Sequence, residues 1–189
     1  ALNWLSLSQV YQLIATSSST DALSNASQAS LEGQKRSPLN PTFNINNARI
    51  LLLKKDTAGA LAEIDTAITL KADFLEAFVV RGQIKQSQGE VGAIRDQLLA
   101  YVSIAPYDEQ GYITLGNAYV ALKEYTNAQN AYTRARTINP TNANTYLLYI
   151  SALEQAGEKA KAVEELQKFK AQFPSVQGVD DQIKRIQTS

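Results

Sequence analysis

The sequence contains no cysteine, no histidine and no methionine. Without cysteine and histidine it lacks the side chains of common zinc sites and of thiol or imidazole catalysis, so we predict no metal or other cofactor. Because no methionine is present, Ala1 is not a retained translation start, and we expect a mature form or an excised domain. The missing cysteine fits an extracytoplasmic protein or chance, so the sequence leaves a cytoplasmic or an extracytoplasmic location open.

Charge of either sign is also scarce. The chain has 18 basic and 18 acidic residues, which gives a formal net charge of zero, and charged residues make up 19% of it. No basic stripe of the kind that nucleic-acid binders carry is present, so we predict no nucleic-acid partner. No apolar run reaches the length of roughly 18 residues that a membrane helix needs, so we predict no membrane insertion of this segment.

The most regular stretch runs from Glu109 to Asn142 and predicts two amphipathic helices. The first helical stripe is formed by Tyr112, Leu115, Gly116 and Tyr119. The second stripe is formed by Ala128, Tyr132 and Ala135, and Pro140 ends this second helix. These spacings resemble the tetratricopeptide repeat, whose pattern is W-x2-L-G-x2-Y, then A-x3-F-x2-A, then P, with tyrosine here in place of Trp and Phe.

The same plan recurs along the whole chain. Pro106, Pro140 and Pro174 follow one another at the 34-residue period of the family. One repeat cannot bury its apolar face alone, so neighbours must stack on it. We therefore predict a single array over residues 1–189, with repeats at 1–40, 41–74, 75–108, 109–142 and 143–176 and a capping helix at 177–189. The resemblance implies an all-α fold, a right-handed α-α superhelix of five helix pairs plus a C-terminal capping helix.

The first repeat departs from the pattern between its two helices. About six extra residues lie there, within the segment ATSSSTDALSN at 15–25, which is rich in residues that form turns and helix caps. We expect a flexible loop in solvent. The alternative is a loop that contacts a parent domain or a partner, because loops often carry binding residues.

Several glycines have predicted structural roles. Gly82 and Gly116 stand where the two helices of one repeat should cross closely, because glycine removes the side chain at that point. Gly89 and Gly157 stand where a first helix must end, and glycine accepts the left-handed conformation that such an end requires. Asp56 is a candidate N-cap of the following helix.

We find no enzyme signature and predict that the chain is not an enzyme. The adjacent carboxylates Glu63 with Asp65, and Glu164 with Glu165, lie among polar neighbours on second helices, where a solvated outer face explains them. The stretch Gly89–Gly92 lacks the lysine and the preceding strand of a phosphate-binding loop.

In the tetratricopeptide family the first helices line a concave face, and ligands contact mainly the second, fifth, ninth, twelfth and thirteenth repeat positions. The resemblance therefore implies a partner-binding groove. Its fifth positions, all apolar, are Leu5, Ile45, Val79, Ile113 and Leu147. Its ninth positions, mostly polar and uncharged, are Gln9, Arg49, Gln83, Asn117 and Ser151. Its twelfth positions are Gln12, Leu52, Gln86, Val120 and Glu154.

These positions predict an apolar rail flanked by a nearly uncharged polar row. Carboxamides both donate and accept hydrogen bonds, so they suit the backbone of an extended peptide, and the rail suits its side chains or one face of a helix. The alternative is that the fifth-position residues pack within the array. Arg49 is the only cation at these positions, which argues against the clamp for acidic tails found in some family members. The neutral charge and the 34-residue period argue against the RNA-reading pentatricopeptide type.

The favoured function is a protein-interaction scaffold without catalysis that binds a peptide or helix in this groove. The alternative is an accessory or regulatory domain of a larger bacterial protein, of the membrane-bound type that assembles glycans, which the missing start methionine motivates. A third hypothesis is a homo-oligomer, because an uncapped first repeat would expose an apolar edge.

Overall fold

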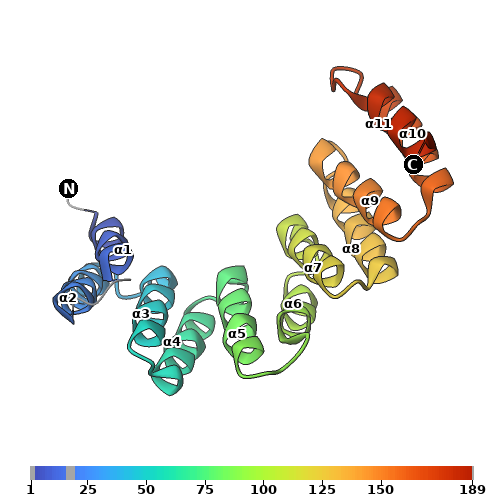
Figure 1. The fold of residues 1–189 in the computed structure, drawn as a ribbon. Coiled ribbons are helices and arrows are strands. Elements are labelled where there is room, and N and C mark those ends of the chain that lie inside the picture. The colour runs from blue at the N-terminus through green and yellow to red at the C-terminus, as the bar shows by residue number, and fades with distance from the viewer. Residues whose placement is uncertain (1–2, 16–19, 189) are drawn as a thin grey trace. The chain divides into compact units, whose positions relative to one another are not determined.

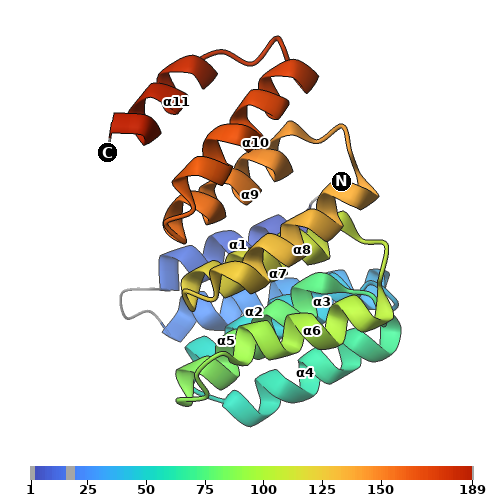
Figure 2. The ribbon, with the colours of Figure 1, turned by 90° about the vertical axis from the view of Figure 1, so that its right-hand side faces the viewer.

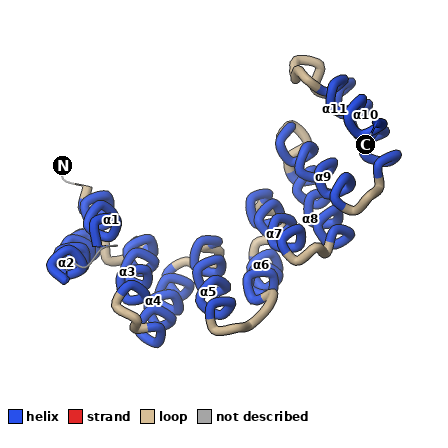
Figure 3. Tube along the Cα trace, in the orientation of Figure 1, coloured by secondary structure: helices blue, strands red, loops and turns tan. Residues whose placement is uncertain are grey.

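The computed structural model describes residues 3–15 and 20–188, which form helices joined by short loops (Figure 1). The described residues contain no strand (Figure 3). In chain order the helices are α1 (Trp4–Ile14), α2 (Thr20–Arg36), α3 (Pro41–Leu53), α4 (Thr57–Leu70), α5 (Leu75–Ser87), α6 (Ala93–Ile104), α7 (Glu109–Ala121), α8 (Tyr125–Ile138), α9 (Ala143–Gln155), α10 (Lys159–Gln172) and α11 (Val179–Thr188).

The order of the helices follows the predicted pairing. First helices α3, α5, α7 and α9 begin at Pro41, Leu75, Glu109 and Ala143, which are the residues where the sequence pattern places the start of a repeat. Each is followed by a second helix, and α11 comes after the last pair. The predicted all-α fold class, helix pairs plus a C-terminal helix, is therefore confirmed.

Backbone contacts divide the chain into two compact units, residues 1–97 and residues 98–189. In unit 1, α1 packs on α2 and α3 on α4, while α2 also packs on α3 and α4 on α5. In unit 2, α7 packs on α8, α8 on α9, α9 on α10 and α10 on α11 (Figure 2). Within each unit, a second helix thus contacts both its own partner and the first helix of the following pair.

Small and large apolar residues alternate in the cores of these stacks. In unit 1 the core cluster of α3, α4 and α5 consists of Ile45, Ala48, Ala60, Ile64, Ala67, Ala77, Val80 and Ile84. In unit 2 the cluster of α9, α10 and α11 consists of Tyr146, Ile150, Leu153, Ala162, Leu166, Phe169, Val179 and Ile186. Alanines let the helix backbones approach, and the branched and aromatic side chains fill the remaining space at the density of a protein interior.

Two glycines lie where paired helices come into close contact, as the sequence predicted. A Cβ atom on Gly82 would lie 2.6 Å from the Cα atom of Ile94 at the start of α6. A Cβ atom on Gly116 would lie 2.7 Å from the Cδ1 atom of Tyr132 on α8. Both distances are shorter than real Cβ contacts, so these helices can cross this closely only where the side chain is missing.

The first helices end in one conformation in four repeats. Gly89 and Gly157 have φ angles of 96° and 80°, which confirms the predicted left-handed ends. Lys55 and Lys123 occupy the same repeat position with φ angles of 62° and 60°. A lysine side chain disfavours this conformation, so these two ends carry local strain that the glycine ends do not. After Lys55, the predicted N-cap Asp56 accepts a hydrogen bond at Oδ1 from the backbone nitrogen of Gly59 over 2.8 Å.

The first repeat corrects one expectation. Helix α2 begins at Thr20, so residues 20–25 are helical and do not form part of a loop. Ala22 and Ala26 are 4% and 0% exposed, because their helical spacing places both on the side of α2 that packs into the fold. Residues 16–19, the rest of the predicted loop, lie outside the described residues. None of the described helices is both long and apolar enough to cross a membrane.

We predict that the Gly116→Leu variant loses cooperative folding of unit 2. The added side chain would overlap the buried ring of Tyr132, and overpacking of this kind costs about 3 kcal/mol. Thermal denaturation followed by circular dichroism measures the effect. Ala121→Leu, at an exposed position of the same helix, is the matched control and should melt like the wild type. An unchanged melting temperature for Gly116→Leu would contradict the close crossing of α7 and α8.

We predict that Lys123→Gly stabilises the protein. Removing the strain of a lysine in the left-handed conformation should raise the free energy of unfolding by about 1 kcal/mol. The greater freedom of glycine in the unfolded chain offsets part of that gain. Lys123→Ala should bring no gain, because alanine is as disfavoured in this conformation as lysine. Chemical denaturation of the three proteins makes the comparison. Equal stability of the glycine and alanine variants would show that the φ angle is not the cause.

Candidate functional site

The ninth repeat positions form the clearest common surface feature of the first helices. All five side chains are exposed. In unit 1 they are Gln9 on α1, Arg49 on α3 and Gln83 on α5; in unit 2 they are Asn117 on α7 and Ser151 on α9. We call these five residues the ninth-position row. Within each unit, the stacking of successive pairs repeats this polar position from one first helix to the next.

The one cation of the ninth-position row is paired. Nη2 of Arg49 lies 2.7 Å from Oε1 of Glu76, which occupies the second position of the next repeat. Both side chains are exposed to a substantial extent, so the pair contributes little to stability. The pair cancels the local charge, so the surface around Arg49 stays close to neutral.

Asn117 is held by a buried tyrosine. The hydroxyl of Tyr132 donates to Oδ1 of Asn117 over 2.7 Å. Burial raises the pKa of Tyr132 to about 12, so the phenol remains a hydrogen-bond donor at neutral pH. With its oxygen engaged in this way, the Asn117 amide keeps its nitrogen as the group that can donate to a ligand.

The fifth positions do not form the continuous apolar rail that the sequence predicted. Ile45 is 0% exposed and Ile113 is 7% exposed. Ile45 lies in the core cluster of unit 1 together with Val80 and Ile84 of the next first helix. The interpretation in which fifth-position residues pack within the array therefore holds for Ile45 and Ile113. The remaining members, which stay half-buried, are Leu5, Val79 and Leu147.

The twelfth positions differ from one another. Gln12 is half-buried, and its Nε2 donates to Oδ1 of Asn46 over 2.8 Å. Asn46 in turn donates to the buried Ser8 hydroxyl over 2.8 Å, so Gln12 belongs to a polar network that joins the first two repeats. In unit 1, Leu52 is half-buried and Gln86 is exposed.

In unit 2 the two twelfth-position residues also differ in their surroundings. Val120 is half-buried. The carboxylate of Glu154 accepts hydrogen bonds from Gln182 and Arg185 of α11, over 2.9 and 2.8 Å. The terminal helix therefore already contacts the twelfth position of the last repeat, and among the ninth and twelfth positions of unit 2 the exposed polar residues are Asn117 and Ser151.

The structure adds two leucines that the sequence prediction left out. Leu13 and Leu53, at the thirteenth position of the first two repeats, are 74% and 44% exposed. The family pattern does include the thirteenth position, so this signal was present in the sequence. Together with Leu5, Leu52 and Val79 they supply the apolar surface beside the polar row in unit 1.

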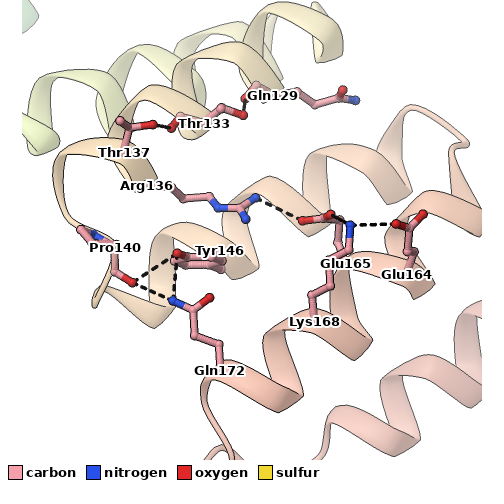
Figure 4. A network of polar contacts seen from close by, with 10 residues as sticks. All are labelled: Gln129, Thr133, Arg136, Thr137, Pro140, Tyr146, Glu164, Glu165, Lys168 and Gln172. Atoms are coloured by element: carbon pink, nitrogen blue, oxygen red, sulfur yellow. Dashed lines mark hydrogen bonds and ion pairs between the residues drawn. The ribbon is translucent and has the colours of Figure 1, made fainter.

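A second polar cluster lies between α8, α9 and α10 of unit 2 (Figure 4). The guanidinium of Arg136 lies 4.0 Å from the ring centre of Tyr146 and 4.8 Å from that of Tyr149. Its Nη1 is 3.3 Å from Oε2 of Glu165. These residues, with Thr133 and Thr137, line a cavity of about 340 Å³. The Arg136 cation is thus stacked on two tyrosines of α9 and paired with a carboxylate of α10. The cluster has a structural role, because these contacts join α8 to α9 and α10.

The adjacent carboxylates do not form an acid–base pair. Nζ of Lys168 lies 2.7 Å from Glu164 and 2.9 Å from Glu165. Its hydrogen bond lowers the pKa of Glu164, so that carboxyl stays ionised at neutral pH, where a general acid would need a raised pKa. On α4, Glu63 accepts a hydrogen bond from Asn44, and Asp65 is paired with Arg81.

Stacked helix pairs with an exposed polar row on their first helices define the class of this protein, a helical-repeat array of the solenoid type. A family model described as the tetratricopeptide repeat matches residues 119–183. This match covers the second helix of the fourth repeat and all of the fifth, and the predicted resemblance to tetratricopeptide repeats is confirmed.

Solved structures extend the likeness in fold beyond the matched residues. MamA from Desulfovibrio magneticus RS-1 is 17% identical with a TM-score of 0.57, covering 93% of this chain and 96% of that one. A thermophilic tetratricopeptide repeat protein from Thermus thermophilus is 16% identical with a TM-score of 0.57, covering 99% of this chain and 98% of that one. YrrB, a tetratricopeptide repeat protein with an unusual peptide-binding site, is 18% identical with a TM-score of 0.52, covering 78% and 76%.

No curated protein matches the sequence. At the identities given above, the solved structures support the fold and leave function to be argued from the residues of this chain.

Proposed function

We propose that this protein is a non-catalytic scaffold that binds another polypeptide on the faces of its first helices. The observation that carries the proposal is the ninth-position row, which exposes a hydrogen-bonding side chain in all five repeats. Polar residues that stay exposed at one position of every repeat offer contacts at regular intervals, as an extended or helical ligand requires. The likeness in fold to YrrB, which has a peptide-binding site, is consistent with this use.

Unit 1 offers the more complete face. Gln9, Gln83 and Gln86 are exposed carboxamides that can donate to a peptide carbonyl and accept from a peptide N–H. Leu52 and Leu53 are accessible apolar side chains on the intervening first helix. The ion pair of Arg49 with Glu76 on this face has no net charge. The ligand that fits is a weakly charged segment, bound through its backbone and a few apolar side chains.

We predict that Gln83→Ala/Gln86→Ala weakens peptide binding about tenfold or more, because each neutral hydrogen bond contributes about 1 kcal/mol. Peptides are first selected from a random library on the wild-type protein, and their affinities for both proteins are measured by calorimetry. Both glutamines are exposed, so the fold should be unaffected. Replacing the buried Ile113 would weaken the core instead, which makes it unsuitable for this test.

The matched control is Thr66→Ala/Thr69→Ala, at two exposed positions of the second helix α4. It should bind the selected peptides with wild-type affinity. If the glutamine variant bound as tightly as the wild type, or if the threonine variant lost binding instead, the site would lie away from the first helices.

We also predict that salt has little effect on this binding. The dissociation constants should change by less than about threefold between roughly 50 and 500 mM NaCl, because screening acts on charges and the proposed contacts are neutral. Titrations at the two salt concentrations provide the measurement. A loss of affinity of about tenfold or more at high salt would instead indicate a clamp for a charged ligand.

A further inference from the structure

Two cavities of this protein are built from the same repeat positions. In unit 1, residues of α2, α3 and α4 line a cavity of about 240 Å³, among them Asn47 and Glu63. In unit 2, residues of α8, α9 and α10 line the cavity of about 340 Å³ described above, among them Tyr149 and Glu165, which stand three 34-residue periods later. We call these cavities the unit 1 groove and the unit 2 groove. Each lies within one unit, between one first helix and two second helices.

The chain itself fills the unit 2 groove with a guanidinium group. Arg136 of α8 stacks on the rings of Tyr146 and Tyr149, and its Nη1 lies 3.3 Å from Oε2 of Glu165 (Figure 4). The side chains of Arg136 and Glu165 are only 22% and 15% exposed, so this ion pair is largely shielded from water. A glutamate at this repeat position is therefore placed to pair with an arginine that enters the groove.

The unit 1 groove keeps the glutamate but lacks the arginine. Glu63 stands at the position of Glu165, and Gln34 stands at the position of Arg136. Oε1 of Gln34 accepts a hydrogen bond from Nδ2 of Asn47 over 3.2 Å, so this uncharged side chain is directed towards α3. Two asparagines take the places of the two tyrosines. Among the described residues, no cation forms an ion pair with Glu63.

A buried asparagine holds Glu63 in place. Asn44 is 2% exposed, and its Nδ2 donates to Oε2 of Glu63 over 2.7 Å. Oδ1 of Asn44 is buried and has no hydrogen-bond partner among the described residues. This end of the groove therefore has acceptor atoms without a donor. A guanidinium group has five N–H donors and no acceptor, so it has the chemistry that this end lacks.

The basic residues of unit 1 closest to the groove have other partners. Lys54 lines the groove, but its Nζ is turned towards α2, where it donates to Oγ of Ser27 over 2.8 Å. Lys35, which follows Gln34 on α2, pairs with Glu32 over 2.8 Å. Within the described part of unit 1, the chain thus provides no counter-ion for Glu63.

We propose that the unit 1 groove binds an arginine side chain of a partner polypeptide, whose guanidinium pairs with Glu63 in the place that Arg136 takes in unit 2. The proposal does not rest on the proposed function, because the groove lies between the second helices α2 and α4 and does not include the ninth-position row. Leu31 and Leu51 provide apolar surface for the methylene groups of the arginine. Arginine is favoured over lysine, because the unit 2 groove holds a planar guanidinium at this position.

Titration of the isotopically labelled whole chain, followed by nuclear magnetic resonance, tests the proposal. The probe is N-acetyl-arginine-N-methylamide, which mimics an arginine within a polypeptide. It should bind with a dissociation constant of the order of millimolar, as expected for so small a ligand, and shift the side-chain amide signals of Asn44 and Asn47. The citrulline analogue has nearly the same shape without the charge. It should bind at least about tenfold more weakly, because a charge-assisted hydrogen bond is stronger than a neutral one.

The variant Glu63→Gln removes the charge and keeps an acceptor for Asn44. It should fold like the wild type and bind the arginine probe at least about tenfold more weakly. Glu90→Gln, at an exposed carboxylate of the same unit, is the matched control and should bind like the wild type. Gln83→Ala/Gln86→Ala should also bind the probe like the wild type, so this site and the proposed function can fail separately.

The variant Gln34→Arg tests the comparison between the two grooves. It places an arginine on α2 where α8 has Arg136, so it should fill the unit 1 groove and abolish binding of the probe, with an unchanged circular dichroism spectrum. No binding up to about 50 mM, equal affinities for the arginine and citrulline probes, or wild-type affinity in Glu63→Gln or Gln34→Arg would overturn the proposal. Free arginine that bound about tenfold more tightly than the probe would overturn it in favour of a small-molecule site.

Discussion

The structure depends on how closely two paired helices can approach at the eighth position of each repeat. At Gly82 and Gly116 there is no space for a Cβ atom, and the partner helix occupies that volume. Because the two helices of a pair interlock there, the opposite side of the second helix stays available to the next pair, and stacking can continue. In the last pair the eighth position is Ile150, which is buried in the core cluster of α9, α10 and α11.

This stacking decides which side chains of a first helix a partner can reach. The helix must contact its own second helix and the neighbouring pairs, so little of its surface stays free. The ninth position stays exposed in every repeat, whereas the fifth is buried in the core at Ile45 and Ile113. The first helices therefore expose a hydrogen-bonding side chain in each repeat and only scattered apolar ones, and this is the reason why the proposed ligand is bound mainly through its backbone.

Helices α1 and α11 expose different kinds of side chain to solvent. Helix α11 buries Val179 and Ile186 against the last repeat and exposes charged residues, so it covers apolar surface of the last repeat. Glu154 strengthens this contact by binding Gln182 and Arg185. Helix α1 has no charged residue and little buried apolar surface, although the network of Ser8, Gln12 and Asn46 joins it firmly to the second repeat. Both α1 and α11 are helices packed on a neighbouring helix, and they differ in the charge and the burial of their side chains.

The sequence by itself determined the period, the helix pairs and most of their ends. These features depend on local patterns, such as the spacing of apolar residues, the glycines at 89 and 157 and the N-cap at Asp56, which a single stretch of chain contains. Only the tertiary structure decided that Ile45 and Ile113 are buried, that Gln12 serves a buried network, and that Lys55 and Lys123 adopt the left-handed conformation. The tertiary structure also decided that α2 starts at Thr20, because the packing of Ala22 and Ala26 outweighs the turn-forming composition around them. In each case the outcome depends on a neighbouring helix, which the local pattern does not specify.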